Sequence, residues 1–197
     1  YFDIPMFCET DVNVAAFGEA VQGAAVGKDS CIYLTIGTGV GGGYVANGEF
    51  LPTLLHPEMG HFQLKRLPGD TFEGICPFHK DCVEGLVSGP AIEARMGKKA
   101  FDIAADDPVW DIVAQYIAQA LQAYTMILSP EKIILGGGVM KQEQLFPLIR
   151  KYFLEYINGY INFESLGVSM EDYIVPPSLP DYSATVGCIE IAKRLVK

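Results

Sequence analysis

The chain has 197 residues, 50% of them hydrophobic, and its 24 acidic and 14 basic residues give a net charge of −10. A chain of this length and composition can bury the core of one large or two small domains, which argues against disorder. The negative charge disfavours nucleic acid and anionic membrane surfaces as partners, because both are themselves anionic. The longest apolar stretches are too short for a bilayer span, which needs roughly 20 apolar residues.

The start of the chain and its cysteines bear on cellular location. The sequence begins with Tyr1 rather than Met and shows no charged-then-apolar leader, so no signal peptide is predicted and a truncated start is expected. The five cysteines have no disulfide-framework spacing. This usage favours a reducing, cytoplasmic environment.

In chain order, the first predicted elements are a helix and a group of strands. Apolar residues recur at helical spacing over 12–26. Residues 31–36 form a continuous apolar and β-branched run, typical of a buried strand. Two short strands, 44–46 and 49–51, are expected on either side of a tight turn at Asn47-Gly48.

A long irregular segment separates these elements from a second α/β part. Residues 52–83 hold four prolines and little periodicity, which indicates a functional or metal-stabilised loop. Asp107 and Pro108 then provide a helix N-cap and first-turn proline. The remaining predicted elements are helices over 84–96, 108–128, 142–157 and 184–196, and strands over 132–135 and 173–175. This alternation predicts an α/β fold.

The irregular segment also contains all three histidines and two of the cysteines. Cys76, His79 and Cys82 have zinc-knuckle spacing, and His61 can complete a tetrahedral set of four ligands. With no position left open for water, such a site is structural and would hold the loop together. The alternative is a loop with solvent-facing histidines and unpaired thiols. His56 is the spare histidine.

Two glycine-rich runs follow predicted strands. The run 36–43 lies between two strands rather than before a helix, which excludes a Walker A loop or a dinucleotide fingerprint. Its amides and Thr38 suit phosphate oxygens, although a structural bend is an equally good interpretation. Residues 136–138 follow a strand and precede a helix, so a nucleotide could lie against their backbone.

Three carboxylates stand out by position. Asp11 lies where an apolar stretch gives way to a helix and so could be an ordinary N-cap. Glu58 and Glu84 flank the predicted metal ligands, so a metal would hold both facing one cleft. Carboxylates held in this way suit the hydroxyl groups of a sugar.

Together these motifs resemble the ROK family of sugar kinases, closest to its bacterial zinc-containing fructokinases. The resemblance covers essentially the whole chain and rests on ordered motifs at residues 9–19, 36–41, 56–61, 76–84, 88–91 and 134–139. It implies the actin-like, hexokinase-type (ribonuclease H-like) α/β fold, mostly its second lobe. It also implies an ATP-dependent kinase that transfers a phosphoryl group to a sugar, with ATP, Mg²⁺ and Zn²⁺ as cofactors and a homodimeric assembly.

By position, Asp11 resembles the catalytic base of the family, which accepts the proton of the attacking sugar hydroxyl. The remaining family positions fall on Glu58, His61 and Glu84 for the sugar, on Gly37, Thr38 and Gly39 for phosphate, on Gly136, Gly137 and Gly138 for adenosine, and on His61, Cys76, His79 and Cys82 for zinc.

The resemblance also implies a domain division. Residues 1–30 would end the small N-terminal lobe, and residues 31–183 would form the large lobe with a zinc loop over 56–84. Residues 184–197 would be a helix that packs back on the small lobe. The family's N-terminal Asp-x-Gly-Gly-Thr hairpin is absent, so on the order of a hundred residues are expected to be missing.

Specific departures favour D-fructose as the substrate. Thr10 replaces an asparagine found in many relatives, and His56-Pro57 replaces Ala-Gly; both match the fructokinase branch. His79 replaces a cysteine and keeps a tetrahedral set. Mannose, glucose or an N-acetylated hexosamine remain alternative substrates. A ROK repressor or sugar sensor is a second alternative, and a zinc-knuckle nucleic-acid module a third, which the negative charge disfavours.

Overall fold

The computed structural model describes residues 4–196, so the outer ends of the predicted segments 1–30 and 184–197 lie outside the described residues. The helices are α1 (Asp11–Gln22), α2 (Val83–Val87), α3 (Gly89–Met96), α4 (Val109–Leu128), α5 (Leu145–Ile157), α6 (Met170–Tyr173) and α7 (Ser183–Leu195). The strands are β1 (Ser30–Ile36), β2 (Val40–Ala46), β3 (Glu49–Phe50), β4 (Lys132–Gly136) and β5 (Ile174–Val175). No helix within this range has the length and apolar character needed to cross a bilayer.

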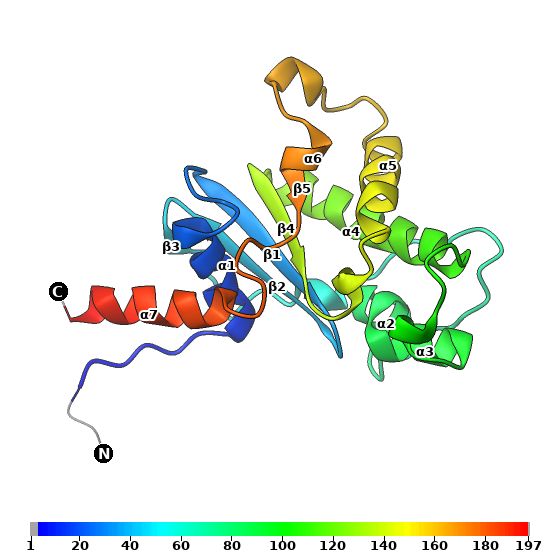
Figure 1. Cartoon of the computed structure of the whole chain (residues 1–197), viewed down its shortest axis with the longest axis horizontal. Coiled ribbons are helices and arrows are strands. Elements are labelled where there is room, and N and C mark those ends of the chain that lie inside the picture. The colour runs from blue at the N-terminus through cyan, green and yellow to red at the C-terminus, as the bar shows by residue number, and fades with distance from the viewer. Residues whose placement is uncertain (1–3, 197) are drawn as a thin grey trace.

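The strands form one mixed sheet in the order β3-β2-β1-β4-β5. β1 and β2 form an antiparallel hairpin, whereas β1, β4 and β5 run parallel to one another. Figure 1 shows α1 and α7 on one side of this sheet and α4 and α5 on the other. The carboxyl ends of β1 and β4 therefore lie side by side, at the edge where open α/β sheets place their ligands.

Side-chain alternation along β1 divides the core in two. Ile32, Leu34 and Ile36 point into the larger core, which includes α4 and α5. Cys31 and Tyr33 point to the opposite face, into a smaller core with α1. Burial of both faces explains why the sequence of this strand is a continuous apolar run, as predicted.

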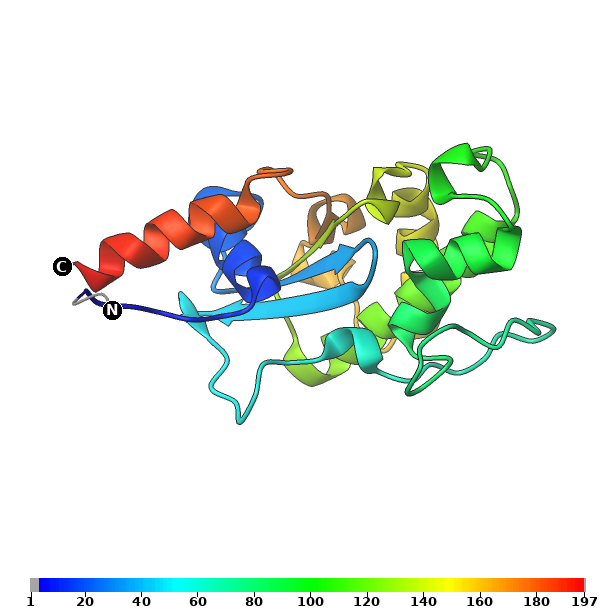
Figure 2. The ribbon, with the colours of Figure 1, turned by 90° about the horizontal axis from the view of Figure 1, so that it is seen from below.

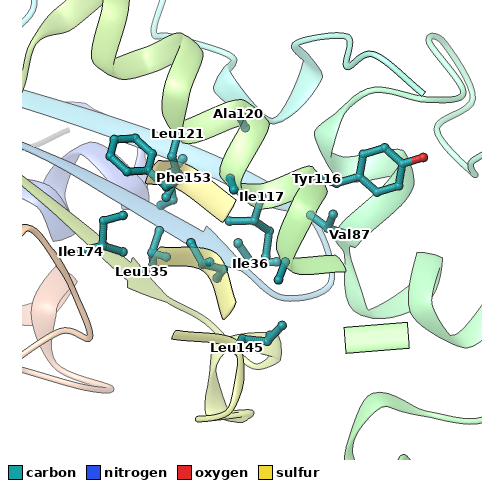
Figure 3. Packing of buried hydrophobic residues seen from close by; sticks show 14 of the residues in the cluster. Ile36, Val87, Tyr116, Ile117, Ala120, Leu121, Leu135, Leu145, Phe153 and Ile174 are labelled. Atoms are coloured by element: carbon teal, nitrogen blue, oxygen red, sulfur yellow. The ribbon is translucent and has the colours of Figure 1, made fainter. Parts of the chain in front are cut away.

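Within the larger core, α4 packs across the sheet. Figure 3 shows Ile117 and Leu121 of α4 against Ile36, the last residue of β1, and Leu135, the second-last residue of β4. All four side chains are at most 2% exposed. The strand ends from which the glycine loops depart are thereby held by packed side chains, which gives those loops a rigid base.

Most predicted elements are confirmed, with changes at their ends. The tight turn has positive φ at both Asn47 and Gly48, as a type I′ hairpin requires. Asp107 Oδ1 accepts from the N–H of Val109 at 2.9 Å, so it caps α4 as expected. The first helix ends at Gln22 rather than at residue 26, because Gly23 leaves the helical conformation.

Two further helices differ from the prediction. The helix expected over 84–96 is divided at Ser88, whose extended backbone ends α2 and whose hydroxyl caps α3. The helix expected from residue 142 begins at Leu145, because a 3₁₀ turn over Val139–Lys141 comes first. Polar side chains that bond to the backbone compete with helix continuation in this way.

The last helix packs against the first. The side of α1 that carries Gly18 meets α7 so closely that a Cβ at Gly18 would lie 2.0 Å from the Ser183 carbonyl oxygen. A Cβ at Gly187 would lie 2.0 Å from the Val14 carbonyl oxygen. Figure 2 shows α7 lying along α1, away from the remaining helices. A glycine in each helix therefore allows the backbones to touch.

Candidate active site and metal cluster

Several of the predicted site residues line one cleft. Asp11, Glu58 and Glu84 surround a space of about 350 Å³. The glycine loop that joins β1 to β2 forms another wall of the same space, through Gly37, Thr38 and Gly39. Residues from α1, the hairpin, the irregular segment and α2 thus converge on one volume. A polar cleft of this kind combines carboxylates with backbone amides.

Asp11 is the first residue of α1, and the helix is capped by its neighbour. Thr10 Oγ1 accepts from the Asn13 N–H at 3.2 Å, whereas Asp11 Oδ1 accepts from the adjacent Val12 N–H and from no other described donor. The interpretation of Asp11 as the N-cap is therefore wrong, because the threonine before it performs that role. The Asp11 carboxylate is exposed and lines the cleft, where a base could accept a proton.

The glycine loop adopts a hydrogen-bonded shape of its own. The Gly37 N–H donates to the Gly39 carbonyl at 2.9 Å, and the Gly37 carbonyl accepts from the Gly89 N–H at 2.7 Å. The loop connects two strands and precedes no helix, as predicted. Its contact with Gly89 also fixes it to the first turn of α3.

The other two carboxylates differ in how they are held. Glu58 is exposed, and its Oε1 lies 2.7 Å from His56 Nε2. Glu84 reaches from α2 to the hairpin, where its Oε2 accepts from the Val40 N–H at 3.0 Å. His56, which the sequence leaves without a metal role, thus contacts Glu58 at the cleft, where both residues line the space.

Gly136, Gly137 and Gly138 line a different cleft, of about 410 Å³. Tyr33 and Asp181 lie on its other walls. The two clefts are joined by a third space, of about 400 Å³, which contains Gly37 and Thr38 from the first and Gly138 from the second. The three spaces thus adjoin one another through shared lining residues at the carboxyl ends of β1 and β4, and together they are called the crevice below.

Sequence reasoning missed the walls of the joining space. Lys99 and Phe101 lie there, with the ammonium 5.8 Å from the ring centroid. They belong to a short 3₁₀ turn after α3 and carry no motif or periodicity. Only the tertiary arrangement brings them beside Gly138.

The four predicted metal ligands come together. The ligand atoms of His61, Cys76, His79 and Cys82 all lie within 4.8 Å of one another. His61 Nδ1 is 3.7 Å from the sulfur of both Cys76 and Cys82, and His79 Nδ1 is 3.8 Å from Cys76 Sγ. Tetrahedral zinc with its usual bond lengths places S and N ligands about 3.6 Å apart, so the donor set fits this ion.

The two sulfurs differ in acidity. Burial alone would raise the pKa of Cys76, but hydrogen bonds from the backbone of His79 and Phe78 and from Cys82 lower it below its usual value. Burial raises the pKa of Cys82 to about 11, and the adjacent Cys76 adds to the effect. Bringing both thiolates into one site thus calls for a compensating positive charge, as a bound cation supplies.

His61 occupies the metal cluster rather than the sugar cleft wall. Its Nδ1 faces the two sulfurs, and the residue does not line the cleft of Asp11, Glu58 and Glu84. In the sequence, His61 comes three residues after Glu58 of the cleft and before the other three members of the cluster. The structure therefore brings three of the four predicted sugar and catalytic residues together, with the fourth behind them.

A buried ion pair supports the loop from the other side. The Arg95 guanidinium donates to Asp70 Oδ1 at 2.6 Å and to Oδ2 at 3.0 Å, and the Tyr116 hydroxyl donates to Oδ2 at 2.6 Å. The Tyr116 oxygen accepts in turn from the Leu67 N–H at 3.2 Å. The segment after His61, one of the predicted metal ligands, is thus tied to α3 and α4.

Comparison with known proteins places this arrangement in a family. A family model described as "ROK family" matches residues 1–195. A Bacillus subtilis relative is 50% identical over 194 residues, which cover 98% of this chain and 65% of the relative. The fructokinase of Pediococcus pentosaceus is 47% identical over 196 residues, 100% of this chain and 67% of the relative. The chain thus spans about two thirds of the curated relatives it matches.

The fold agrees with this assignment. The crystal structure of a ROK hexokinase from Thermus thermophilus superposes with a TM-score of 0.76 at 26% identity, over 96% of this chain and 67% of that one. The predicted actin-like, hexokinase-type α/β fold is therefore confirmed. The match along nearly its whole length shows that the chain belongs to the ROK family.

Proposed function

We propose that this chain is the larger part of an ATP-dependent hexose kinase, a fructokinase that converts D-fructose and ATP to fructose 6-phosphate and ADP. The observation that carries the proposal is the shared cleft, in which the carboxylate of Asp11 and the glycine loop 37–39 face one volume. Phosphoryl transfer needs a base for the hydroxyl and amides for the phosphate. The relatives named fructokinase add support at the level of sequence.

In this proposal Asp11 accepts the proton of the sugar hydroxyl while the hydroxyl oxygen attacks the γ-phosphorus of ATP, and ADP leaves with the bond electrons. Glu58 and Glu84 bind the sugar hydroxyls, and His61, whose Nδ1 faces the zinc ligands, would contact the sugar through its other ring nitrogen. Gly37, Thr38 and Gly39 hold the phosphates, and Gly136, Gly137 and Gly138 hold adenosine. Mg²⁺ would accompany ATP and neutralise its charge.

We assign His61, Cys76, His79 and Cys82 to one structural zinc ion. The spacing of the donor atoms supports the ion, and its site adjoins the residues that flank the cleft. Zinc would hold the loop over 56–84 in place and so orient Glu58 and Glu84. The ion takes no part in the reaction itself.

The assembly and location are part of the same proposal. Residues 1–30 would end a small lobe and residues 31–183 would form the large lobe, with residues 184–197 returning to the small lobe. The packing of α7 on α1 supports this return. The enzyme would act in the cytoplasm as a homodimer, since none of the five cysteines forms a disulfide, which suits a reducing compartment.

The alternative functions require different residues in the cleft. A repressor or sugar sensor of the same family would bind a sugar but has no need of a base beside a phosphate loop. Both features are present in one cleft here. Glucose, mannose or an N-acetylated hexosamine as substrate would keep the mechanism and change only the contacts to the sugar.

A coupled assay of ADP release with the complete protein tests the proposal. Fructose is expected to give the highest kcat/KM among fructose, mannose, glucose and N-acetylated hexosamines. A glucose value equal to or above that of fructose contradicts the substrate. Sugar binding without any ADP release supports the sensor instead.

A further inference from the structure

A second group of polar residues surrounds a cavity that shares no residue with the crevice. The cavity has a volume of about 520 Å³ and lies between the segment 62–68, α4 and α5. Its polar lining consists of Gln63, Lys65, Arg66, Gln115, Gln119, Gln122 and Tyr156. A space of this size lies in the range that small-molecule ligands occupy.

The glutamines of α4 form a stripe along one wall. Gln115, Gln119 and Gln122 are spaced four and three residues apart, which places them on one face of the helix. Within residues 4–196, the only hydrogen bond of these three side chains joins Gln119 Nε2 to the Tyr156 hydroxyl, at a long 3.5 Å. All three are partly buried. Each amide offers both donors and acceptors, the combination that hydroxyl groups require.

The charge of the cavity is opposite to that of the protein. The lining includes two cations, Lys65 and Arg66, and, among the described residues, no acidic side chain. Lys65 makes no ion pair within the part of the chain that the structure covers. Arg66 donates to the backbone carbonyl of Asp70 at 3.1 Å and makes no ion pair with any described residue. The lining itself therefore carries two positive charges in a protein of net charge −10, and Glu155, beside the lining residue Tyr156, is the acidic group that acts on that tyrosine.

The walls of the cavity are held in place before any ligand arrives. At one end of the segment 62–68, the Phe62 carbonyl accepts from the Val83 N–H at 3.0 Å. At the other end, the Leu67 N–H donates to the Tyr116 hydroxyl at 3.2 Å. These bonds fix the backbone of the segment, so that binding would have to order only side chains such as the exposed Lys65.

We propose that this cavity is a second ligand site, for a small phosphorylated polyol such as a sugar phosphate. Lys65 and Arg66 would bind the phosphate group, and the glutamine stripe with Tyr156 would bind the hydroxyl groups. The site does not depend on the proposed function, because none of its residues lines the cleft of Asp11.

Calorimetric titration of the complete protein tests this site, with fructose 6-phosphate as the probe and saturating fructose present to occupy the cleft. Lys65→Gln, alone and combined with Arg66→Gln, is expected to weaken binding by about tenfold or more. Because the single variant keeps the Arg66 bond to Asp70, a loss of binding in Lys65→Gln cannot come from the loss of that bond. Lys28→Gln, an exposed lysine that lines none of the clefts described above, is the matched control and should bind as the parent does.

A further variant, titrated with two probes, separates a polyol site from a simple anion site. Gln122→Leu keeps the helix and removes the amide, so fructose 6-phosphate should bind several-fold more weakly while inorganic phosphate is unaffected. Equal loss for both probes, or no loss for either, contradicts the polyol assignment.

Three further results would overturn the proposal. If fructose 6-phosphate binds equally well to every Lys65 and Arg66 variant, the cavity is not its binding site. Binding that is lost in Glu58→Gln instead belongs to the cleft, whatever the outcome of the kinase assay. Sedimentation showing that Lys65→Gln/Arg66→Gln dissociates an oligomer without changing ligand affinity assigns this surface to a second copy of the chain.

Discussion

The carboxylate of Glu84 accepts a hydrogen bond from the backbone N–H of Val40 at 3.0 Å. Glu84 lies two residues after the metal ligand Cys82, and Val40 begins the strand that follows the glycine loop. A single side chain therefore connects the metal cluster to the proposed phosphate loop. Through this connection, the zinc ion proposed above would influence the geometry of the cleft from outside it.

Replacing Glu84 should release the hairpin locally. We expect Glu84→Ala to lower the hydrogen-exchange protection of the Val40 amide by about tenfold, because its acceptor is lost. Glu84→Gln is the matched control, since its amide oxygen still accepts the bond. Unchanged protection in Glu84→Ala would show that another group holds Val40.

Metal analysis tests the four-ligand cluster. Protein purified without added metal is expected to contain one zinc per chain, and Cys76→Ser should reduce the content below about half an equivalent and lower the thermal midpoint. Cys188→Ser removes an exposed thiol outside the cluster and should change neither quantity. Equal zinc content in both variants would contradict the assignment.

Asp11→Asn tests the catalytic base in the complete protein. We expect kcat to fall by about 10² to 10⁴ with little change in the Kd of either ligand, because the amide cannot accept the proton. The fold should survive, since Thr10 caps the helix and not Asp11. Asp29→Asn, at an exposed carboxylate before β1, should leave kcat unchanged. Retention of more than roughly a tenth of kcat by Asp11→Asn rejects the role.

The Asp70–Arg95 pair should make stability sensitive to acid. Burial alone would raise the pKa of Asp70, but hydrogen bonds from Arg95, Tyr116 and the Phe72 N–H lower it from 3.8 to about 2. Because the folded-state pKa lies below the unfolded value, the carboxylate contributes about 2 kcal/mol that is fully present above pH 3.8. This contribution is lost as the pH falls through about 2.

Urea unfolding of the parent and of Asp70→Asn between pH 7 and pH 2.5 measures this effect. At pH 7 the variant should be less stable by about 3 to 5 kcal/mol, since Arg95 loses its buried partner. The difference should shrink as the pH falls. Asp106→Asn, at an exposed position, should follow the parent at every pH. A pH-independent difference for Asp70→Asn would contradict the linkage.

The sequence by itself determined the elements and the ligand types. The run over 31–36 predicted a strand covered on both faces, and Asn47-Gly48 predicted the turn that the structure contains. Knuckle spacing identified Cys76, His79 and Cys82, because ligands that are neighbours in the chain need only a tight local turn to meet. Such signals depend on residues close together in the chain, so they can be recognised without the tertiary structure.

The tertiary structure decided which residues share a volume. Asp11 and Glu84 are far apart in the chain, and only the packing of α1 and α2 on the hairpin brings them into one cleft. The pairing of Asp70 with Arg95 and the stripe of glutamines beside Lys65 show no sequence signal either. Contacts between distant residues depend on how helices and strands pack, and no local propensity encodes that packing.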